Sequence, residues 1–174
     1  YGAIGEWDVS RVTSLKDLFK DVHAFNSDIS AWNVSKVTTL LNTFSGASAF
    51  NSDLSTWDVS KATTLEYTFK GASAFNSDLS KWKVSKITTF SNTFYAAHVF
   101  NSDLSTWDVS KVINLCNTFK NAIAFNSDIS KWDVFKVESW DNMLLGSPAF
   151  NQGVWCSSSW NTQKIYITLP PGNR

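Results

Sequence analysis

Apolar residues recur along this chain with a period of 25 residues. Tryptophan marks the period, and columns of valine, leucine and phenylalanine keep the same register. A fixed period in this range is typical of a stack of similar units, each of which buries its apolar face against the next. The pattern therefore predicts a repeat domain with one continuous core. The tryptophans are Trp7, Trp32, Trp57, Trp82, Trp107 and Trp132.

A short strand is predicted around each tryptophan. Trp57 and Val59 are two residues apart, so their side chains share one face of an extended segment over residues 56–60. Because the valines form an apolar column, the tryptophans should point into the core with them. We therefore interpret the tryptophans as core residues rather than as an aromatic binding surface.

A short helix is predicted after each strand. Val37, Leu40 and Phe44 follow one another at intervals of three and four, which favour a helix of about two turns over residues 38–45. A column of mostly glycine then stands where a left-handed residue would end the helix. Ala96 belongs to this column and predicts a less regular end in its coil. The other members that fit the rule are Gly46, Gly71, Asn121 and Gly146.

Together these elements predict an α/β fold. Parallel strands joined by helices should wind right-handed, giving a solenoid of about six coils, each with one short parallel β-strand and one short helix. Residues 1–150 are expected to form this single repeat domain, with an incomplete N-terminal coil. Residues 151–174 lose the pattern and are expected to form an irregular C-terminal cap and tail. The chain begins in mid-unit, which suggests a fragment of a longer protein.

An asparagine column marks the turn that leads back to the next strand. At this position a side-chain amide can satisfy backbone groups of the neighbouring coil. We expect these amides to be buried and to link successive coils. The column contains Asn26, Asn51, Asn76, Asn101, Asn126 and Asn151.

Composition narrows the function classes. The formal net charge is zero, which argues against a nucleic-acid binder or a strongly electrostatic membrane module. No apolar stretch is long enough to form a transmembrane segment. The 15% of aromatic residues fall mostly in the repeat columns, so they are interpreted as core packing.

Catalytic signatures are missing from the sequence. His23 and His98 share one repeat position three coils apart, so they should not form a site together. Cys116 and Cys156 are expected on opposite faces and unpaired, and neither their number nor their spacing indicates a zinc site. The sequence therefore predicts a protein that is not an enzyme and has no cofactor.

The repeat W-D-V-S-x-V-T-x-L-x-x-x-F-x-G-A-x-x-F-N-x-D-L-S closely resembles the short repeats of BspA-like leucine-rich repeat surface proteins. The resemblance covers roughly residues 4–151. It implies a leucine-rich-repeat-type solenoid in an extracellular or cell-surface protein. It also implies binding or adhesion to a protein or other extracellular macromolecule, or a structural scaffold. End-to-end association of copies stays open.

In related solenoids the outward sheet face is the usual binding face, so we expect the binding residues there. In this chain that face is polar and mixed in charge. Lys81 and Lys83 are flanked by Asp58 and Asp108, which also fits neighbouring coils that neutralise one another. The candidate binding residues are Thr56, Asp58, Lys81, Lys83, Thr106, Asp108, Lys131 and Asp133.

An aspartate column offers an alternative. Its carboxylates would lie about 5 Å apart on normally stacked strands. Another interaction must then compensate for their electrostatic repulsion. Hydrogen bonds from nearby backbone N–H groups could supply it, as could a row of calcium ions. A threonine ladder that organises water, including Thr38, Thr63 and Thr88, is a further alternative, although these threonines suit helix caps. The column consists of Asp28, Asp53, Asp78, Asp103 and Asp128.

Overall fold

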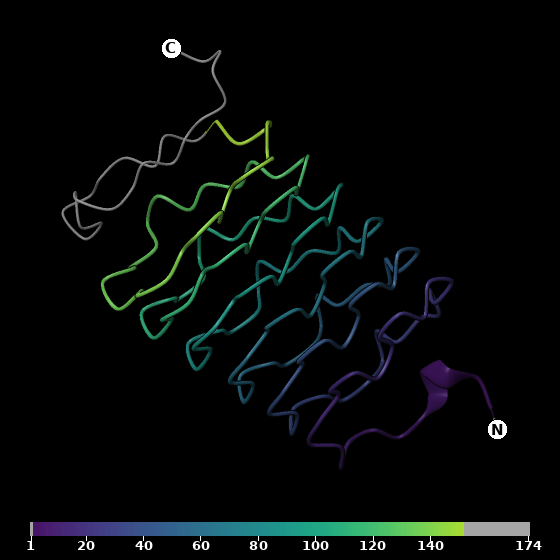
Figure 1. Cartoon of the computed structure of the whole chain (residues 1–174). Helices are drawn as coiled ribbons and strands as arrows, with labels where there is room; N and C mark the ends of the chain where they lie inside the picture. The colour runs from purple at the N-terminus through teal and green to yellow at the C-terminus, as the bar shows by residue number, and fades with distance from the viewer. Residues whose placement is uncertain (1, 152–174) are drawn as a thin grey trace.

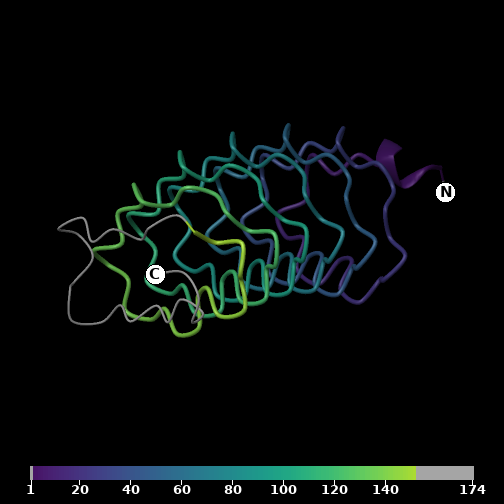
Figure 2. The same ribbon diagram turned by 90° about the horizontal axis from the view of Figure 1, so that it is seen from above.

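Over residues 2–151, which the computed structural model describes, the chain forms a stack of similar coils. Successive repeats lie side by side from the N-terminal to the C-terminal end of the stack (Figure 1). Viewed from above, the coils follow one another in the same orientation (Figure 2). The 25-residue period of the sequence is therefore the length of one coil.

Regular secondary structure is almost absent from these residues. One 3-10 helix, η1, spans Ile4–Glu6. Parallel pairing is confined to isolated bridges that do not extend into strands. The predicted right-handed, leucine-rich-repeat-type α/β solenoid, with one strand and one helix in each coil, is therefore wrong. The bridges join Ser14 to Thr39, Thr64 to Thr89, Thr89 to Asn114, and Asn114 to Ser139.

The segment predicted as a helix is a run of overlapping turns. In the coil that contains Leu65, the Thr68 N–H donates to the Leu65 carbonyl at 3.0 Å. The Ala72 N–H donates to the Phe69 carbonyl at 3.1 Å. Both bonds join residues three apart, whereas an α-helix joins residues four apart. Inward side chains still recur every three or four residues, which explains why the apolar pattern imitates a helix.

The other backbone N–H groups of this segment bond to the next coil. The Tyr67 N–H donates to the Ser91 carbonyl at 3.0 Å, and the Phe69 N–H donates to the Thr93 carbonyl at 2.9 Å. Along the segment, N–H groups therefore alternate between their own turn and the neighbouring coil. This alternation joins the coils without a helix and without a continuous strand ladder.

Two left-handed residues in each of the six coils prevent the segment from continuing as a helix. In one coil they are Asn42, with a φ of 56°, and Gly46, with a φ of 74°. Asparagine, aspartate and glycine tolerate this conformation better than other residues. The left-handed glycine column is confirmed, but it ends no helix. Ala96, expected to be irregular, has the same conformation with a φ of 54°.

Residues 56–60, predicted as a strand, connect two turns. The Trp57 N–H donates to the Leu54 carbonyl at 3.1 Å, and the Ala62 N–H donates to the Val59 carbonyl at 2.9 Å. A strand ladder requires backbone N–H groups that pair with a neighbouring strand. Because the Trp57 N–H bonds within its own coil, the segment cannot form the predicted ladder through it.

Tryptophan and phenylalanine fill the core, and their predicted inward orientation is confirmed. The five tryptophans from Trp32 to Trp132 are only 1–4% exposed. Phe44 and Phe69 stack in successive coils with ring centres 5.6 Å apart. Phe69 and Phe75 stack within one coil at 4.0 Å. The rings thus form continuous columns through the stack.

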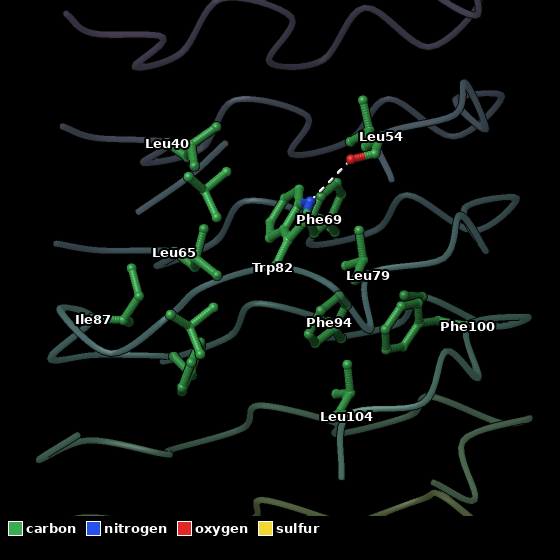
Figure 3. Packing of buried hydrophobic residues seen from close by; sticks show 14 of the residues in the cluster. Leu40, Leu54, Leu65, Phe69, Leu79, Trp82, Ile87, Phe94, Phe100 and Leu104 are labelled. Carbon is green, nitrogen blue, oxygen red and sulfur yellow. Dashed lines mark hydrogen bonds between the residues drawn. The ribbon is translucent and has the colours of Figure 1, made fainter. Parts of the chain in front are cut away.

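Buried polar groups also join successive coils. The Trp82 indole N–H donates to the Leu54 carbonyl at 2.9 Å (Figure 3). The Thr68 hydroxyl lies 2.9 Å from the Leu40 carbonyl of the preceding coil and 2.8 Å from the Leu65 carbonyl of its own. Thr68 is fully buried, and it belongs to a column that the sequence analysis does not single out. The column also contains Thr43, Thr93 and Thr118.

The asparagine column links the coils as predicted. The side-chain oxygen of Asn51 accepts the backbone N–H of Asn76 at 2.8 Å, and the same bond is repeated between each successive pair from Asn26 to Asn151. The prediction that these amides are buried is wrong, because most of them are exposed. The ladder therefore runs along the surface of the stack.

The N-terminal end of the stack exposes residues whose equivalents are buried in the interior. Trp7 is 47% exposed, whereas Trp32 in the next coil is 4% exposed. Leu18 and Val22 are exposed at the same end. The predicted C-terminal cap and tail, residues 151–174, lies outside the described residues except for Asn151.

Candidate functional site

All eight residues of the candidate face are exposed. We use this name for Thr56, Asp58, Lys81, Lys83, Thr106, Asp108, Lys131 and Asp133. They flank the buried tryptophans in sequence, as Lys81 and Lys83 flank Trp82. Because each tryptophan points into the core, its two neighbours lie on the outside of the coil. The structure thus brings the predicted residues together on one wall of the stack, although that wall is not a sheet.

The threonines of the candidate face take part in bonds between coils. The Thr56 hydroxyl donates to the Ser30 carbonyl, and the Thr106 hydroxyl donates to the Ser80 carbonyl, both at 2.9 Å. These hydroxyls therefore have a structural partner in the preceding coil. They can still accept a hydrogen bond from a ligand through the remaining lone pair.

The aspartates of the candidate face are held by local turns. The Asp58 carboxylate accepts the backbone N–H of Ser60 at 3.0 Å, and Asp108 accepts that of Ser110 at 3.1 Å. Side-chain and backbone hydrogen bonds from these serines lower the pKa of both carboxyl groups below the ordinary value of 3.8. Both groups are therefore charged at neutral pH. The nearby Lys83 ammonium lowers the pKa of Asp58 further.

The lysines make fewer specific contacts than the other side chains of the candidate face. Lys81, Lys83 and Lys131 are exposed, and within residues 2–151 none of them forms a hydrogen bond or a close ion pair. The positive charge of Lys83 lowers the pKa of Asp58 without such a contact. Partial neutralisation between coils is therefore present, and ammonium N–H donors remain available to a partner.

Hydrogen bonds from backbone N–H groups stabilise the aspartate column. Asp53 accepts the N–H of Ser55, and Asp78 accepts the N–H of Ser80, both at 2.9 Å. The same bond is made by Asp28, Asp103 and Asp128. Backbone hydrogen bonds from the serines are the main cause that lowers the pKa of Asp28, Asp53, Asp78 and Asp128.

Calcium has no evident binding site along this column. Over residues 2–151 no group of three or more histidine, cysteine, aspartate or glutamate side chains is arranged to hold a metal ion. One carboxylate in each coil is a small ligand set for an ion that takes six to eight oxygen ligands. The serine turns already explain how neighbouring carboxylates are accommodated.

The threonine ladders are used within the protein. The Thr63 hydroxyl donates to the Thr38 carbonyl of the preceding coil at 3.3 Å. The Thr64 hydroxyl accepts the N–H of Glu66 at 3.0 Å. The predicted role as helix caps is wrong, because these bonds stabilise turns and junctions between coils. They give no support to a water-organising surface.

The histidines stay apart, as the sequence predicts. The His23 ring nitrogen Nδ1 lies 2.7 Å from the Gly46 carbonyl, whereas His98 is three coils away in the stack. Cys116 is a half-buried free cysteine, and Cys156 lies outside the described residues. The two histidines and Cys116 belong to the described part of the chain, and there the structure does not bring the two histidines together into a catalytic group.

A cluster that the sequence analysis does not single out lies on another wall. Two half-buried tyrosines, Tyr67 and Tyr95, contact the ammonium groups of Lys70 and Lys120. A signal was available in the sequence, because Tyr67 interrupts a repeat position that otherwise holds only asparagine or aspartate.

Comparison with known proteins gives one family. The family model described as "Mycoplasma protein of unknown function, DUF285" matches residues 2–98 and again residues 75–168. No curated protein and no solved structure matches the chain significantly. In the described part of the chain, no helix has the length and apolar character needed to cross a membrane.

Proposed function

This chain belongs to the Mycoplasma family of unknown function DUF285, and we propose that it is a non-enzymatic repeat module that binds a protein or other extracellular macromolecule. In this proposal the candidate face makes the contact, and the interior of the stack serves as a rigid scaffold. In this proposal the protein acts outside the cell or at the cell surface.

The exposure of all eight candidate residues around a fully packed core is the observation that supports this function best. Tryptophan, phenylalanine and threonine side chains in the interior are committed to packing and to bonds between coils. Lys81, Lys83 and Lys131 offer charged donors on the outside. Charged residues at the edge of an interface steer association and select partners.

The electrostatics of the carboxyl groups favour a binding role over catalysis. A general base works best with a pKa near the operating pH. Serine hydrogen bonds instead lower the pKa of Asp58 and Asp108, so these groups are weak bases at neutral pH. Turnover of a substrate that depended on any residue of this chain would contradict the non-enzymatic part of the proposal.

Binding is tested with the purified chain on a panel of immobilised extracellular matrix proteins, with serum albumin as a reference surface. We expect saturable binding to at least one matrix protein. The Lys81→Gln/Lys83→Gln variant should bind about tenfold more weakly, because two charge-assisted contacts are lost. The Lys70→Gln/Lys120→Gln variant removes the same charge from another wall and should bind this partner normally. Equal affinity for all three chains, or no binding, would contradict the proposal.

The cellular location is tested by treating intact cells that express this protein with an external protease. A surface protein should be cleaved within this repeat domain while cytoplasmic proteins stay whole. Protection of the domain until the cells are lysed would contradict the extracellular assignment.

A further inference from the structure

Four side chains from three successive coils form a tyrosine–lysine cluster, which we define as Tyr67, Lys70, Tyr95 and Lys120. The Lys70 ammonium lies 5.3 Å from the ring centre of Tyr67 and 5.6 Å from that of Tyr95. The Lys120 ammonium lies 5.8 Å from the Tyr95 ring centre. All four side chains are half-buried. They are therefore partly packed against the protein, and a ligand can still reach them.

Tyr67 occupies a position that disfavours tyrosine. Its φ is 55°, and in every other coil this left-handed position holds asparagine or aspartate. A side chain other than asparagine, aspartate or glycine pays a steric cost in this conformation. The position occurs in six coils, and five of them hold asparagine or aspartate. Tyrosine at this position is therefore specific to one coil.

Ala96, which follows Tyr95, is the second such exception. Its φ is 54°, and the equivalent residues in the other coils are glycine, asparagine or aspartate. Among residues 2–151, Tyr67 and Ala96 are the two left-handed residues outside these three types. Both lie at the tyrosine–lysine cluster. Backbone strain that persists at one place on a surface often marks a functional site.

The charge of the cluster indicates the ligand. Within the described part of the chain, neither Lys70 nor Lys120 has a carboxylate within ion-pair distance. The tyrosine rings hold the ammonium groups by cation–π contact, and an ammonium has three N–H donors, so donors remain for an anion. The tyrosine hydroxyls add neutral donors and acceptors. This set of groups suits a ligand that carries both acid groups and hydroxyls.

The position of the lysines indicates an extended ligand. Lys20, Lys70 and Lys120 occupy the same repeat position on alternate coils, with Tyr95 between the last two. Lysine therefore recurs on alternate coils, and in the first of them Asp17 and Asp21 stand beside Lys20. A linear polymer with regularly spaced acid groups can contact the lysines in succession. A globular protein partner would need a far larger surface, about 800 Å² per partner.

We propose that the tyrosine–lysine cluster binds an acidic polysaccharide, whose acid groups accept hydrogen bonds from Lys70 and Lys120 and whose hydroxyls contact the tyrosines. The cluster lies on a different wall from the candidate face. Lys70 follows Phe69 in the sequence, whereas Lys81 and Lys83 flank Trp82. The ring centres of Phe69 and Trp82 lie 6.1 Å apart in the core, so the two walls lie on opposite sides of these rings. The two sites are therefore separate.

The test measures binding of the full chain to sodium polygalacturonate, to dextran sulfate and to uncharged dextran by calorimetry. We expect binding to one or both charged polymers and none to dextran, and the tighter polymer identifies carboxylate or sulfate as the preferred acid group. The Lys70→Gln/Lys120→Gln variant should bind about tenfold more weakly or not at all. The Lys81→Gln/Lys83→Gln variant loses the same charge elsewhere and should bind as the parent chain does.

A second variant separates binding from folding. Tyr67→Asn restores the residue type of the other coils and should unfold at the same or a higher temperature than the parent chain. It should nevertheless bind the charged polymer more weakly. No binding to either charged polymer would overturn the proposal, as would equal loss in both lysine variants or unchanged binding by Tyr67→Asn. Each of these results would leave the proposed role of the candidate face standing.

Discussion

The indole N–H of Trp82 donates a hydrogen bond to the backbone carbonyl oxygen of Leu54 in the preceding coil, at 2.9 Å. The same carbonyl accepts the backbone N–H of Trp57 in its own turn at 3.1 Å. One oxygen thus closes a turn and joins two coils. Equivalent indole bonds are made by Trp32, Trp57, Trp107 and Trp132. Tryptophan is therefore suited to this column by its N–H group as well as by its size.

Substitution of Trp82 should separate these two contributions. Trp82→Phe keeps an aromatic ring but removes the N–H donor, and it should lower the free energy of unfolding by about 1–3 kcal/mol. Trp82→Ala also leaves a cavity and should cost about 3–5 kcal/mol. Urea unfolding followed by circular dichroism measures both. Equal stability of Trp82→Phe and the parent chain would show that the indole bond contributes nothing.

Asn76 tests the asparagine ladder on the surface. Its side-chain oxygen accepts the N–H of Asn101 at 2.8 Å. Asn76→Ala removes this acceptor and should lower the free energy of unfolding by about 1 kcal/mol. Asn76→Asp keeps an acceptor oxygen and should be less destabilising. If the aspartate variant is as unstable as the alanine variant, the bond to Asn101 is not the cause.

Acid should destabilise the fold through the aspartate column. The folded state lowers the pKa of Asp53 and Asp78 below 3.8, so their contribution is present above the unfolded pKa and is lost as the pH falls through the folded value. We expect the melting temperature to fall between about pH 5 and pH 2. A rise on acidification would show that repulsion between the carboxylates outweighs their serine hydrogen bonds.

Asparagine at the same positions provides the matched control for the acid experiment. An asparagine oxygen can close this type of turn, as Asn33 does with the N–H of Ser35 at 3.2 Å. Replacing Asp28, Asp53, Asp78, Asp103 and Asp128 with asparagine should therefore preserve the fold and reduce its sensitivity to acid. A variant that melts with the same pH dependence as the parent chain would place the acid-sensitive groups elsewhere.

Calcium should leave the stability unchanged. Serine N–H groups satisfy the carboxylates of the column, and the described residues present no cluster of metal ligands. We expect the melting temperature to be the same with millimolar calcium and with a chelator. A shift of several degrees would contradict the scaffold interpretation and restore the calcium alternative, because a ligand that binds only the folded state must stabilise it.

The core was predictable because burial depends on the repeat itself. Any residue type that recurs every 25 positions in an apolar column must face the stack axis, whatever the local backbone does. The inward tryptophans and phenylalanines follow from this argument. The left-handed column at Gly46 and Gly71 was predictable for another reason, because recurring glycine is typical of a position with this conformation. Backbone hydrogen bonds to the aspartate column were also predictable, because an aspartate side chain commonly accepts a nearby backbone N–H. That the donor belongs to the serine two residues after each aspartate is shown only by the structure.

The secondary structure was not predictable from apolar spacing alone. Apolar intervals of three and four suit a helix. Successive turns, each closed by a hydrogen bond between residues three apart, also point side chains inward at these intervals. The distinguishing signal is a second left-handed position, at Asn42 and its equivalents, four residues before the glycine column. The threonine column at Thr68 was missed because a hydroxyl is a poor core residue unless neighbouring carbonyls accept it.

The bond between the Phe69 amide and the next coil distinguishes this stack of turns from a stack of helices most directly. It can be measured by NMR as a scalar coupling across the hydrogen bond, in isotope-labelled protein. The structure predicts a coupling from the Phe69 nitrogen to the carbonyl carbon of Thr93, whose oxygen lies 2.9 Å away. A coupling to Leu65, four residues earlier in the same coil, would show a helix and contradict this account.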